Sequence, residues 1–361
     1  MEEHVSPQAD SEPTEVFLRA CWRLPVDHTP VWFMRQAGRY MAEYRAIRER
    51  YSLLEIIAQP DLAVEVTLQP VQSLGVDAAI VFKDILLPLI PMGIDLEYVK
   101  DKGPVIHNPV RTIQDISALR PIVPEDDLSN VMETIQILRQ ELPVAVPLIG
   151  FAGAPFTIAS YMIEGGSSRH YLVTKSLMYS DPNTWHKLMD KIAQMTADYL
   201  VAQINAGAQV VQLFDSWVGA LSPDDYRQYV LPHSTVVLKA ASETGVPVIH
   251  FGTATATLLK AMHQAGGSVI GLDWRIMLDQ AWDHLGHDVA VQGNLDPALL
   301  LAPMPVLEQR VVKILEQARG RPGHIFNLGH GVLPQTDVES VRAVVEIVHA
   351  YELHAASNGE A

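Results

Sequence analysis

The sequence predicts a (β/α)8 barrel, because eight short apolar runs recur along the chain with helical segments between most of them. Each run is continuously apolar rather than alternating, as parallel strands covered on both faces should be. Repetition of strand and helix favours right-handed parallel crossovers, and eight such units favour closure into a barrel over an open doubly wound sheet. The runs span residues 31–34, 79–82, 146–151, 210–214, 247–251, 269–272, 289–292 and 324–328.

The segments between the runs support one domain. Residues 185–205 and 234–244 show the spacing of apolar residues that is typical of helices. Residues 86–130 are rich in Pro and Gly and lack a clear period, which indicates an excursion at the barrel rim or a small hairpin. The polar ends at 1–14 and 354–361 are predicted to be disordered tails, which leaves a single barrel domain at 15–353.

Composition narrows the class of ligand. The chain has 42 Asp and Glu against 26 Lys and Arg, a net charge of −16, which argues against nucleic-acid and anionic-membrane partners. An anionic ligand would therefore be held by local cations against a repulsive overall field. The single cysteine, Cys21, excludes an internal disulfide framework and suits a reducing compartment. With no signal peptide or membrane-length apolar stretch in the sequence, we expect a cytoplasmic protein.

Polar residues gather directly after the apolar runs, where the active sites of (β/α)8 barrels lie. This agreement between two levels of the sequence favours a site at the carboxyl ends of the strands. The residues concerned include Arg35 and Gln36, Lys83 and Asp84, Asp215 and Ser216, Asp273 and Arg275, and His330 between two glycines.

A dense group of arginines follows the first run. Arg35 and Arg39 flank an Ala-Gly turn, and Arg45, Arg48 and Arg50 follow on a predicted helix. Guanidinium groups hold carboxylates or phosphates in a bidentate manner, so the group predicts a pocket for an anion with several negative groups. The alternatives are surface pairing of Arg35 and Arg39 with acidic neighbours at positions 43 and 65, and a solvated helix face for Arg45 and Arg48.

Four residues outside the arginine group, Asp84, His330, Tyr161 and His250, are also candidates for a functional role. Asp84 follows a buried run, so it either meets a cationic centre at the barrel mouth or caps the next turn. Glycines beside His330 permit close approach of a ligand. Tyr161 lies in a glycine-rich stretch that lacks the spacing of a phosphate-binding loop. His250 has no cysteine or paired histidine near it, which favours a hydrogen-bonding histidine over a metal ligand.

Two stretches, PVWFMRQAGRYMAEYR at 30–45 and GFAGAPFTIASYMIEGG at 150–166, resemble the signatures of the uroporphyrinogen decarboxylase family. The resemblance extends over about 16–351, with supporting matches IVFKDIL, VVQLFDSWVGALSPDDYRQYVLP, IGLDWR, VQGNLDP and HIFNLGHGVLP. It implies a single-domain barrel, usually a homodimer, that uses no metal or organic cofactor. It also implies removal of CO2 from the four acetate side chains of uroporphyrinogen III, which gives coproporphyrinogen III.

The resemblance also implies roles for particular residues. A loop binds the propionate and acetate groups, Asp84 binds the pyrrole N–H groups, and Arg35 lies at the reacting acetate. The catalytic set would be Asp84, Arg35, Tyr161 and His330, with the proton donor left open among Arg35, Tyr161, His330 and a bound water. The substrate-binding set would be Arg35, Gln36, Ala37, Gly38, Arg39, Arg48, Asp84, Tyr161, Ser216 and His330.

The sequence departs from the family pattern at a few positions. Ala42 and Asp337 stand where proline is common, and Lys83 stands where the family has a small polar residue directly before Asp84. Strand alternation predicts that Lys83 points to the side opposite Asp84, although a nearby cation could lower the pKa of Asp84. The order of the four decarboxylations and the isomer preference are not encoded in any recognisable motif.

Two other functions compete. Zinc methyltransferases related to this family place His and Cys close together after the fifth strand, whereas here Gly252 follows His250 and Cys21 is far away in sequence. The second alternative is a tetrapyrrole-binding protein that has lost catalysis. Retention of Asp84 and Tyr161 with the arginines argues against it.

Overall fold

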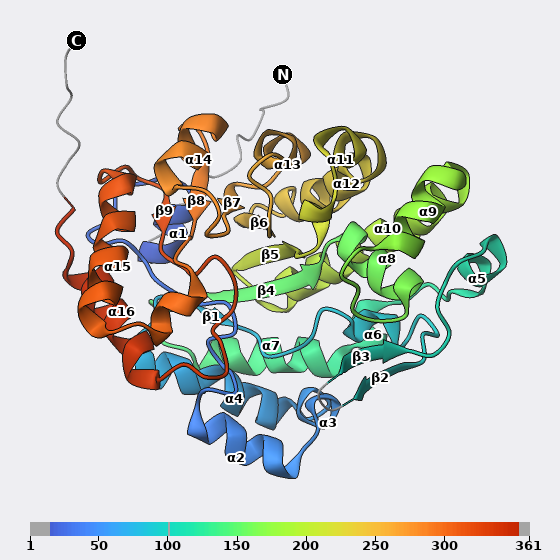
Figure 1. Ribbon diagram of the computed structural model, residues 1–361. Coiled ribbons are helices and arrows are strands. Elements are labelled where there is room, and N and C mark those ends of the chain that lie inside the picture. Colours follow the sequence, from blue (N-terminus) through green and yellow to red (C-terminus); the bar gives the residue numbers. More distant parts are fainter. Residues whose placement is uncertain (1–14, 100–101, 354–361) are drawn as a thin grey trace, which may run out of the picture.

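The computed structural model describes residues 15–99 and 102–353 and shows a curled parallel sheet surrounded by helices (Figure 1). Neighbouring strands pair in parallel in the order β1-β4-β5-β6-β7-β8-β9. The fold is therefore of the (β/α)8 barrel type that the sequence predicted. The strands are β1 (Ala79–Ile80), β4 (Leu148–Gly153), β5 (Val210–Asp215), β6 (Val248–Gly252), β7 (Val269–Gly271), β8 (Ala290–Gln292) and β9 (His324–Ile325).

The predicted first strand at 31–34 is reduced to one parallel bridge, between Val31 and Phe326. On one side the backbone N–H of Phe326 donates to Pro30 O at 2.8 Å, and on the other the N–H of Asp77 donates to Val31 O at 2.9 Å. This segment thus closes the ring between β9 and β1. It cannot pair further, because Pro30 has no N–H to donate and the chain leaves the sheet at Arg35, whose φ is 61°.

Helices form the outer layer. The two helices expected at 185–205 and 234–244 are confirmed as α10 and α12. The long helices are α4 (Pro60–Leu74), α7 (Ser129–Glu141), α10 (Pro182–Ala206), α12 (Leu231–Ser242), α15 (Met304–Ala318) and α16 (Val338–Ala350). Shorter ones are α1 (Val16–Cys21), α2 (Ala42–Arg50), α3 (Leu53–Ile57), α5 (Ile113–Ala118), α6 (Pro124–Asp127), α8 (Pro155–Glu164), α9 (Leu172–Ser180), α11 (Pro223–Tyr229), α13 (Leu259–Ala265) and α14 (Leu278–Leu285), with 3-10 turns η1 (Leu87–Leu89), η2 (Val218–Ala220) and η3 (Pro297–Leu301).

The irregular segment 86–130 contains the predicted small hairpin, made of β2 (Leu96–Val99) and antiparallel β3 (Gly103–Ile106). Backbone N–H groups of Ile106 and Val110 donate to the carbonyls of Gly165 and Met162, both at 2.9 Å, which fasten the excursion to α8. The hairpin and α5 lie together at one edge of the molecule (Figure 1). The excursion therefore belongs to the barrel domain.

The barrel interior combines apolar packing with a short polar chain. The buried Trp32 donates its indole N–H to Gln292 Oε1 at 2.9 Å, and Gln292 in turn donates to Gln212 Oε1 at 3.0 Å. These bonds couple the closing segment to β8 and β5. Within 15–99 and 102–353, no helix is both long and apolar enough to cross a bilayer. The tails predicted at 1–14 and 354–361 lie outside the described residues.

Candidate active site

A cavity of about 470 Å³ opens at the carboxyl ends of the strands. Residues remote in sequence meet there, from the loop after Val31, from the residues after β1, β5 and β9, and from α8. The predicted site residues that line it are Arg35, Ala37, Gly38, Arg39, Asp84, Tyr161, Ser216 and His330.

Gln36 and Arg48, the other two predicted site residues, are not among the lining residues. Gln36 is buried, and its amide accepts from the N–H of Phe33 and donates to Ala78 O, both at 3.1 Å. It thereby anchors the arginine loop to the residue before β1. Arg48 is half-buried on α2 and donates to Tyr51 O at 2.6 Å.

Arg35 occupies an unusual backbone conformation. Its φ of 61° lies in the left-handed region, which costs a non-glycine residue roughly 1–3 kcal/mol and persists only where surrounding contacts hold it. Its side chain rests on Gly331, where a Cβ atom would lie 2.4 Å from Arg35 Cδ and 2.6 Å from Cγ. The glycine after His330 is thus required by the path of the Arg35 side chain across the cavity.

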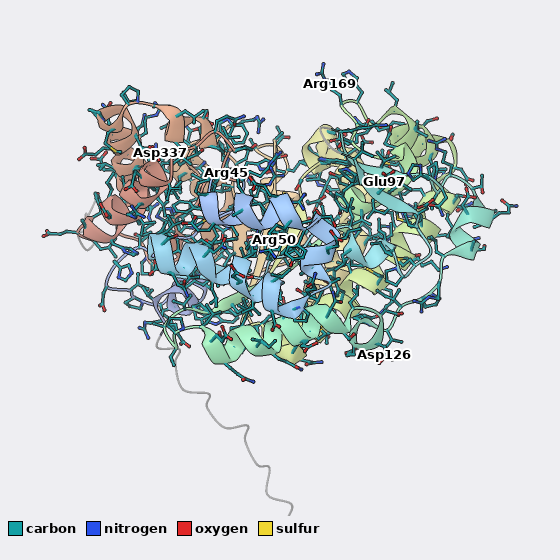
Figure 2. All side chains as sticks on the ribbon, turned by 90° about the horizontal axis from the view of Figure 1, so that it is seen from below. Arg45, Arg50, Glu97, Asp126, Arg169 and Asp337 are labelled. Atoms are coloured by element: carbon teal, nitrogen blue, oxygen red, sulfur yellow. The ribbon has the colours of Figure 1, made fainter. Side chains whose placement is uncertain are left out.

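Arg35 and Arg39 are both exposed. In the part of the chain that the structure describes, neither forms an ion pair with a carboxylate. The surface pairing with acidic neighbours considered from the sequence is therefore absent from the described ion pairs. Arg45 instead fixes the loop, because it donates to the carbonyls of Arg39 and Tyr40 at 2.9 and 2.8 Å. Figure 2 shows Arg45 and Arg50 along α2 on the outside of the molecule. The cavity therefore presents guanidinium groups that can bind an external anion.

Asp84 fulfils both of the roles that the sequence left open. Its Oδ1 accepts from the N–H of Leu86 at 2.8 Å and so caps the following turn, while the side chain also lines the cavity. Burial first, and then the charge of Asp84, raise the pKa values of Tyr98 and Tyr161 above their ordinary range. Both tyrosines remain protonated hydroxyl groups around a carboxylate.

The ammonium group of Lys83 contacts Phe151 and Tyr199, which Asp84 does not contact in the described hydrogen bonds. Nζ donates to Phe151 O at 2.5 Å and lies 3.7 Å from the centre of the Phe151 ring and 4.7 Å from that of Tyr199 on α10. Burial lowers the pKa of Lys83 well below its usual range, although Asp84 opposes this shift. The lysine thus sits between β4 and α10. It nevertheless lines the same cavity as Asp84, so the expected placement on opposite sides is not confirmed, because β1 ends at Ile80 and both residues follow the strand.

An aromatic wall, which sequence reasoning did not assign, forms part of the cavity. The rings of Tyr161 and Trp217 lie 3.8 Å apart between centroids with an interplanar angle of 32°. Trp217 follows Ser216 directly, so its place after a strand was the available signal. The wall is completed by Phe82, Phe151, Phe214 and Phe251. Flat apolar surfaces of this kind suit a flat ring system as ligand.

His330 is a neutral hydrogen-bond donor. Its Nδ1 accepts the N–H of Gly331 at 2.6 Å, so the ring proton resides on Nε2. Burial first, and then the charges of Arg35 and Arg275, lower the pKa of His330 to about 4. At neutral pH this imidazole can donate a hydrogen bond to an anion, but it does not carry a positive charge.

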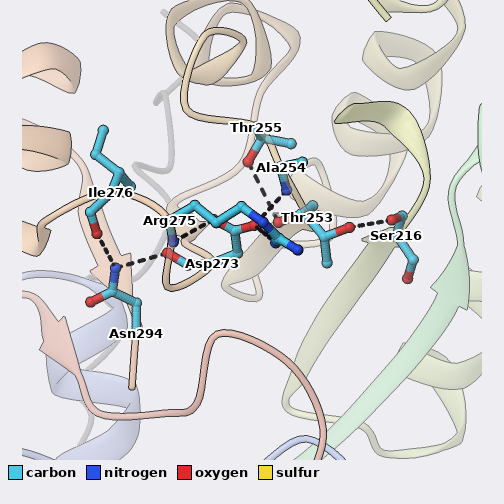
Figure 3. A network of polar contacts seen from close by, with 9 residues as sticks. Ser216, Thr253, Ala254, Thr255, Asp273, Arg275, Ile276 and Asn294 are labelled. Carbon is cyan, nitrogen blue, oxygen red and sulfur yellow. Dashed lines mark hydrogen bonds and ion pairs between the residues drawn. The ribbon is translucent and has the colours of Figure 1, made fainter. Parts of the chain in front are cut away.

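A polar network fixes the rim beside Ser216 (Figure 3). The buried carboxylate of Asp273 accepts from the N–H of Ala254 at 2.5 Å and from the Arg275 guanidinium. Thr253 donates its hydroxyl proton to Ser216 O, and Asn294 donates to Asp273 O at 2.8 Å. The loops after β5, β6, β7 and β8 are therefore tied together around the site.

Two further buried groups lie in the barrel wall. Asp215 accepts from the Thr157 hydroxyl at 2.9 Å, and burial raises its pKa to about 7, so it acts as an internal partner of α8. His250 is fully buried in β6, and its Nδ1 lies 3.3 Å from Met262 O. This contact supports the hydrogen-bonding interpretation of His250.

The pKa of His250 gives a prediction about acid stability. Burial lowers the pKa of His250 to about 4. The unfolded chain, with a pKa near 6.5, then binds a proton first as pH falls, so the stabilisation is complete above about pH 6.5 and is lost progressively down to about pH 4. His250→Asn should reduce the loss of unfolding free energy between about pH 7 and pH 5 by about 2 kcal/mol. Urea-unfolding midpoints of the parent chain and of His250→Asn at both pH values measure this difference.

Comparison with known proteins gives a consistent result. The family model described as uroporphyrinogen decarboxylase matches residues 12–351. The uroporphyrinogen decarboxylase of Sorangium cellulosum is 60% identical over 334 residues, 92% of this chain and 95% of the relative. That of Carboxydothermus hydrogenoformans is 59% identical over 335 residues, 93% and 96% respectively. Among solved structures, a methyltransferase from Methanosarcina mazei superposes with a TM-score of 0.74 at 21% identity, over 92% of this chain and 96% of the other, a likeness of fold.

Proposed function

The chain belongs to the uroporphyrinogen decarboxylase family, and from this premise we propose how its cavity carries out the reaction. The protein is a carboxy-lyase of porphyrin biosynthesis that decarboxylates uroporphyrinogen. We take the substrate to be the III isomer, whose four acetate groups become methyl groups in coproporphyrinogen III with release of four CO2. The observation that carries the assignment of residues is the cavity in which Asp84, Arg35, Arg39 and an aromatic wall meet.

The substrate itself supplies the electron sink. Protonation of a pyrrole ring carbon gives an iminium-like cation conjugated to the CH2–CO2⁻ group. The C–C bond then breaks, CO2 leaves, and the bonding electron pair neutralises the cation to give an exocyclic methylene. Protonation of this methylene and loss of the ring proton restore the pyrrole with a methyl group. No pyridoxal or thiamine is needed for this sequence.

The residues of the cavity match the needs of these steps. Arg35 and Arg39 bind substrate carboxylates, and Arg35 orients the reacting acetate. Asp84 accepts hydrogen bonds from the pyrrole N–H groups and stabilises the developing cation. The aromatic wall holds the macrocycle and excludes water.

Hydrogen-bond donors complete the site. Tyr161, whose pKa is raised, and His330, whose pKa is lowered to about 4, are both neutral at pH 7 and both carry a proton to donate. Ser216 offers a hydroxyl group on the rim. We assign all three to binding of substrate carboxylates. Arg35, Tyr161, His330 and a water held at Arg35 are all weak acids at neutral pH, so each is a candidate for the proton donor.

Anaerobic incubation with uroporphyrinogen III, followed by oxidation and chromatography of the porphyrins, tests the function. Hepta- through tetracarboxylate products should appear in turn. Binding of the substrate without any loss of carboxylates would instead identify a tetrapyrrole carrier. We also propose that the chain forms a homodimer, as the family resemblance implies, and that it is cytoplasmic, as its sequence features suggest. Light scattering of the purified chain tests the first.

Arg39→Ala should raise KM by about 10- to 100-fold and change kcat little, because a charged hydrogen bond to a carboxylate contributes about 1.5–3 kcal/mol and this carboxylate is not the reacting one. Steady-state kinetics under anaerobic conditions give both constants. Arg50→Ala, which removes an exposed guanidinium of α2 that packs on Tyr51, is the matched control and should leave KM unchanged. An equal fall of kcat in Arg39→Ala would contradict a role in binding alone.

A further inference from the structure

Three side chains from distant parts of the sequence converge at the opposite end of the barrel from the cavity. His28 precedes the closing segment, Asp77 precedes β1, and His349 lies in the last turn of α16. His28 Nε2 lies 3.3 Å from Asp77 Oδ1, and His349 Nε2 lies 2.8 Å from Asp77 Oδ2. The two imidazole rings are 4.7 Å apart between centroids in an edge-on arrangement.

We propose that His28, Asp77 and His349 form a binding site for a divalent transition-metal ion, and that the ion is zinc. One ligand atom from each residue can be chosen so that all three lie within 4.8 Å of one another. Ligands at about 2.0–2.2 Å from a tetrahedral zinc ion are separated by about 3.3 Å, so only small side-chain movements are needed to admit the ion. Two imidazoles and one carboxylate are ligand types that zinc binds, and the remaining position is left for water.

The surroundings suit an ion that enters from solvent. The side chains of His28 and His349 are 32% and 34% exposed, whereas that of Asp77 is 13% exposed. Burial alone would raise the pKa of Asp77, but hydrogen bonds from both histidines keep it lowered, so the carboxylate is anionic. The hydrogen bond to Asp77 is also the main cause of the raised pKa of His28. A metal ion would replace protons between these same atoms.

The position of the site gives the ion a structural role. Asp77 holds the closing segment twice, since its N–H donates to Val31 O at 2.9 Å and its Oδ2 accepts from the N–H of Val31 at 2.7 Å. Val31 contributes only one β-bridge to the barrel. An ion on Asp77 would therefore join this closure to α16 through His349. Asp77 and Asp84 lie at opposite ends of β1, so the ion stands outside the decarboxylation chemistry.

The test uses the full chain, stripped with a chelator and then titrated with ZnCl2 in a calorimeter near neutral pH. We expect one site, and a rise in Tm of about 3 °C or more once zinc exceeds Kd about 100-fold. His28→Gln and His349→Gln should each weaken zinc binding by more than about tenfold, since loss even of an outer partner of a metal ligand costs that much. Cobalt substitution should give the visible absorption bands of a four-coordinate ion in the parent chain and not in these variants.

Matched controls keep the interpretation clear. Asp77→Asn is avoided, because it also removes the acceptor of the Val31 N–H. His287→Gln breaks an exposed His–Asp pair of two residues and should bind zinc as the parent does. Zinc affinity that is unchanged in both His28→Gln and His349→Gln, or no saturable binding in the parent, would overturn the proposal and leave a simple His–Asp–His ion-pair cluster.

Discussion

Asp84→Asn is expected to lower kcat by about a thousandfold. An anion about 4 Å from a unit cation contributes about 4 kcal/mol at an effective dielectric constant near 20, which corresponds to this factor in rate. The asparagine Oδ1 can still accept the N–H of Leu86, so the turn after β1 should persist. The loss would then report the missing charge and not a changed fold.

Single-turnover conversion of uroporphyrinogen III, with circular dichroism and Tm as checks of folding, measures this effect. Asp61→Asn, which neutralises an exposed carboxylate on α4, should be indistinguishable from the parent chain. Near-full turnover of Asp84→Asn with unchanged substrate affinity would show that Asp84 does not stabilise the cation. The remaining acceleration must come from orientation and from the exclusion of water.

The sequence anticipated the parts of this structure that depend on local patterning. Continuous apolar runs marked the buried parallel strands, and polar residues just after them marked the edge where the cavity opens. Strand alternation did not place Lys83 on the side opposite Asp84, because β1 ends at Ile80 and both residues line the cavity. The apolar runs and the polar residues after them recur once in each strand–helix unit, so they can be recognised in a single sequence.

The features that sequence reasoning missed depend on the backbone path and on contacts between distant segments. The run at 31–34 resembles a strand, but Pro30 and the positive φ of Arg35 limit it to one bridge. Gln36 stands inside a recognised motif, yet only the position of Ala78 shows that it anchors the loop from behind. Pro104 of the hairpin also lines the cavity. Nothing in the sequence indicates where this hairpin lies relative to the strands of the barrel.

Gly331→Ala should lower kcat/KM by about 10- to 100-fold, although residue 331 offers no side chain to the substrate. The Cβ atom would collide with Cγ and Cδ of Arg35, and no positive φ at residue 331 strains an alanine, so the damage falls on the path of the arginine. Displacement of this guanidinium removes charged hydrogen bonds that contribute about 1.5–3 kcal/mol. The fold should survive, which thermal unfolding checks.

A double-mutant cycle distinguishes this mechanism from general damage to the loop. If Gly331→Ala acts through Arg35, it should cause no further loss of kcat/KM in an Arg35→Ala background, whereas independent effects would multiply. Multiplying losses would mean that residue 331 affects His330 or the rim directly, and the contact with Arg35 would then have no part in catalysis. In the first case, a glycine more than 290 positions away from Arg35 in sequence, adjoining it in the fold, would act on the anion pocket through that arginine alone.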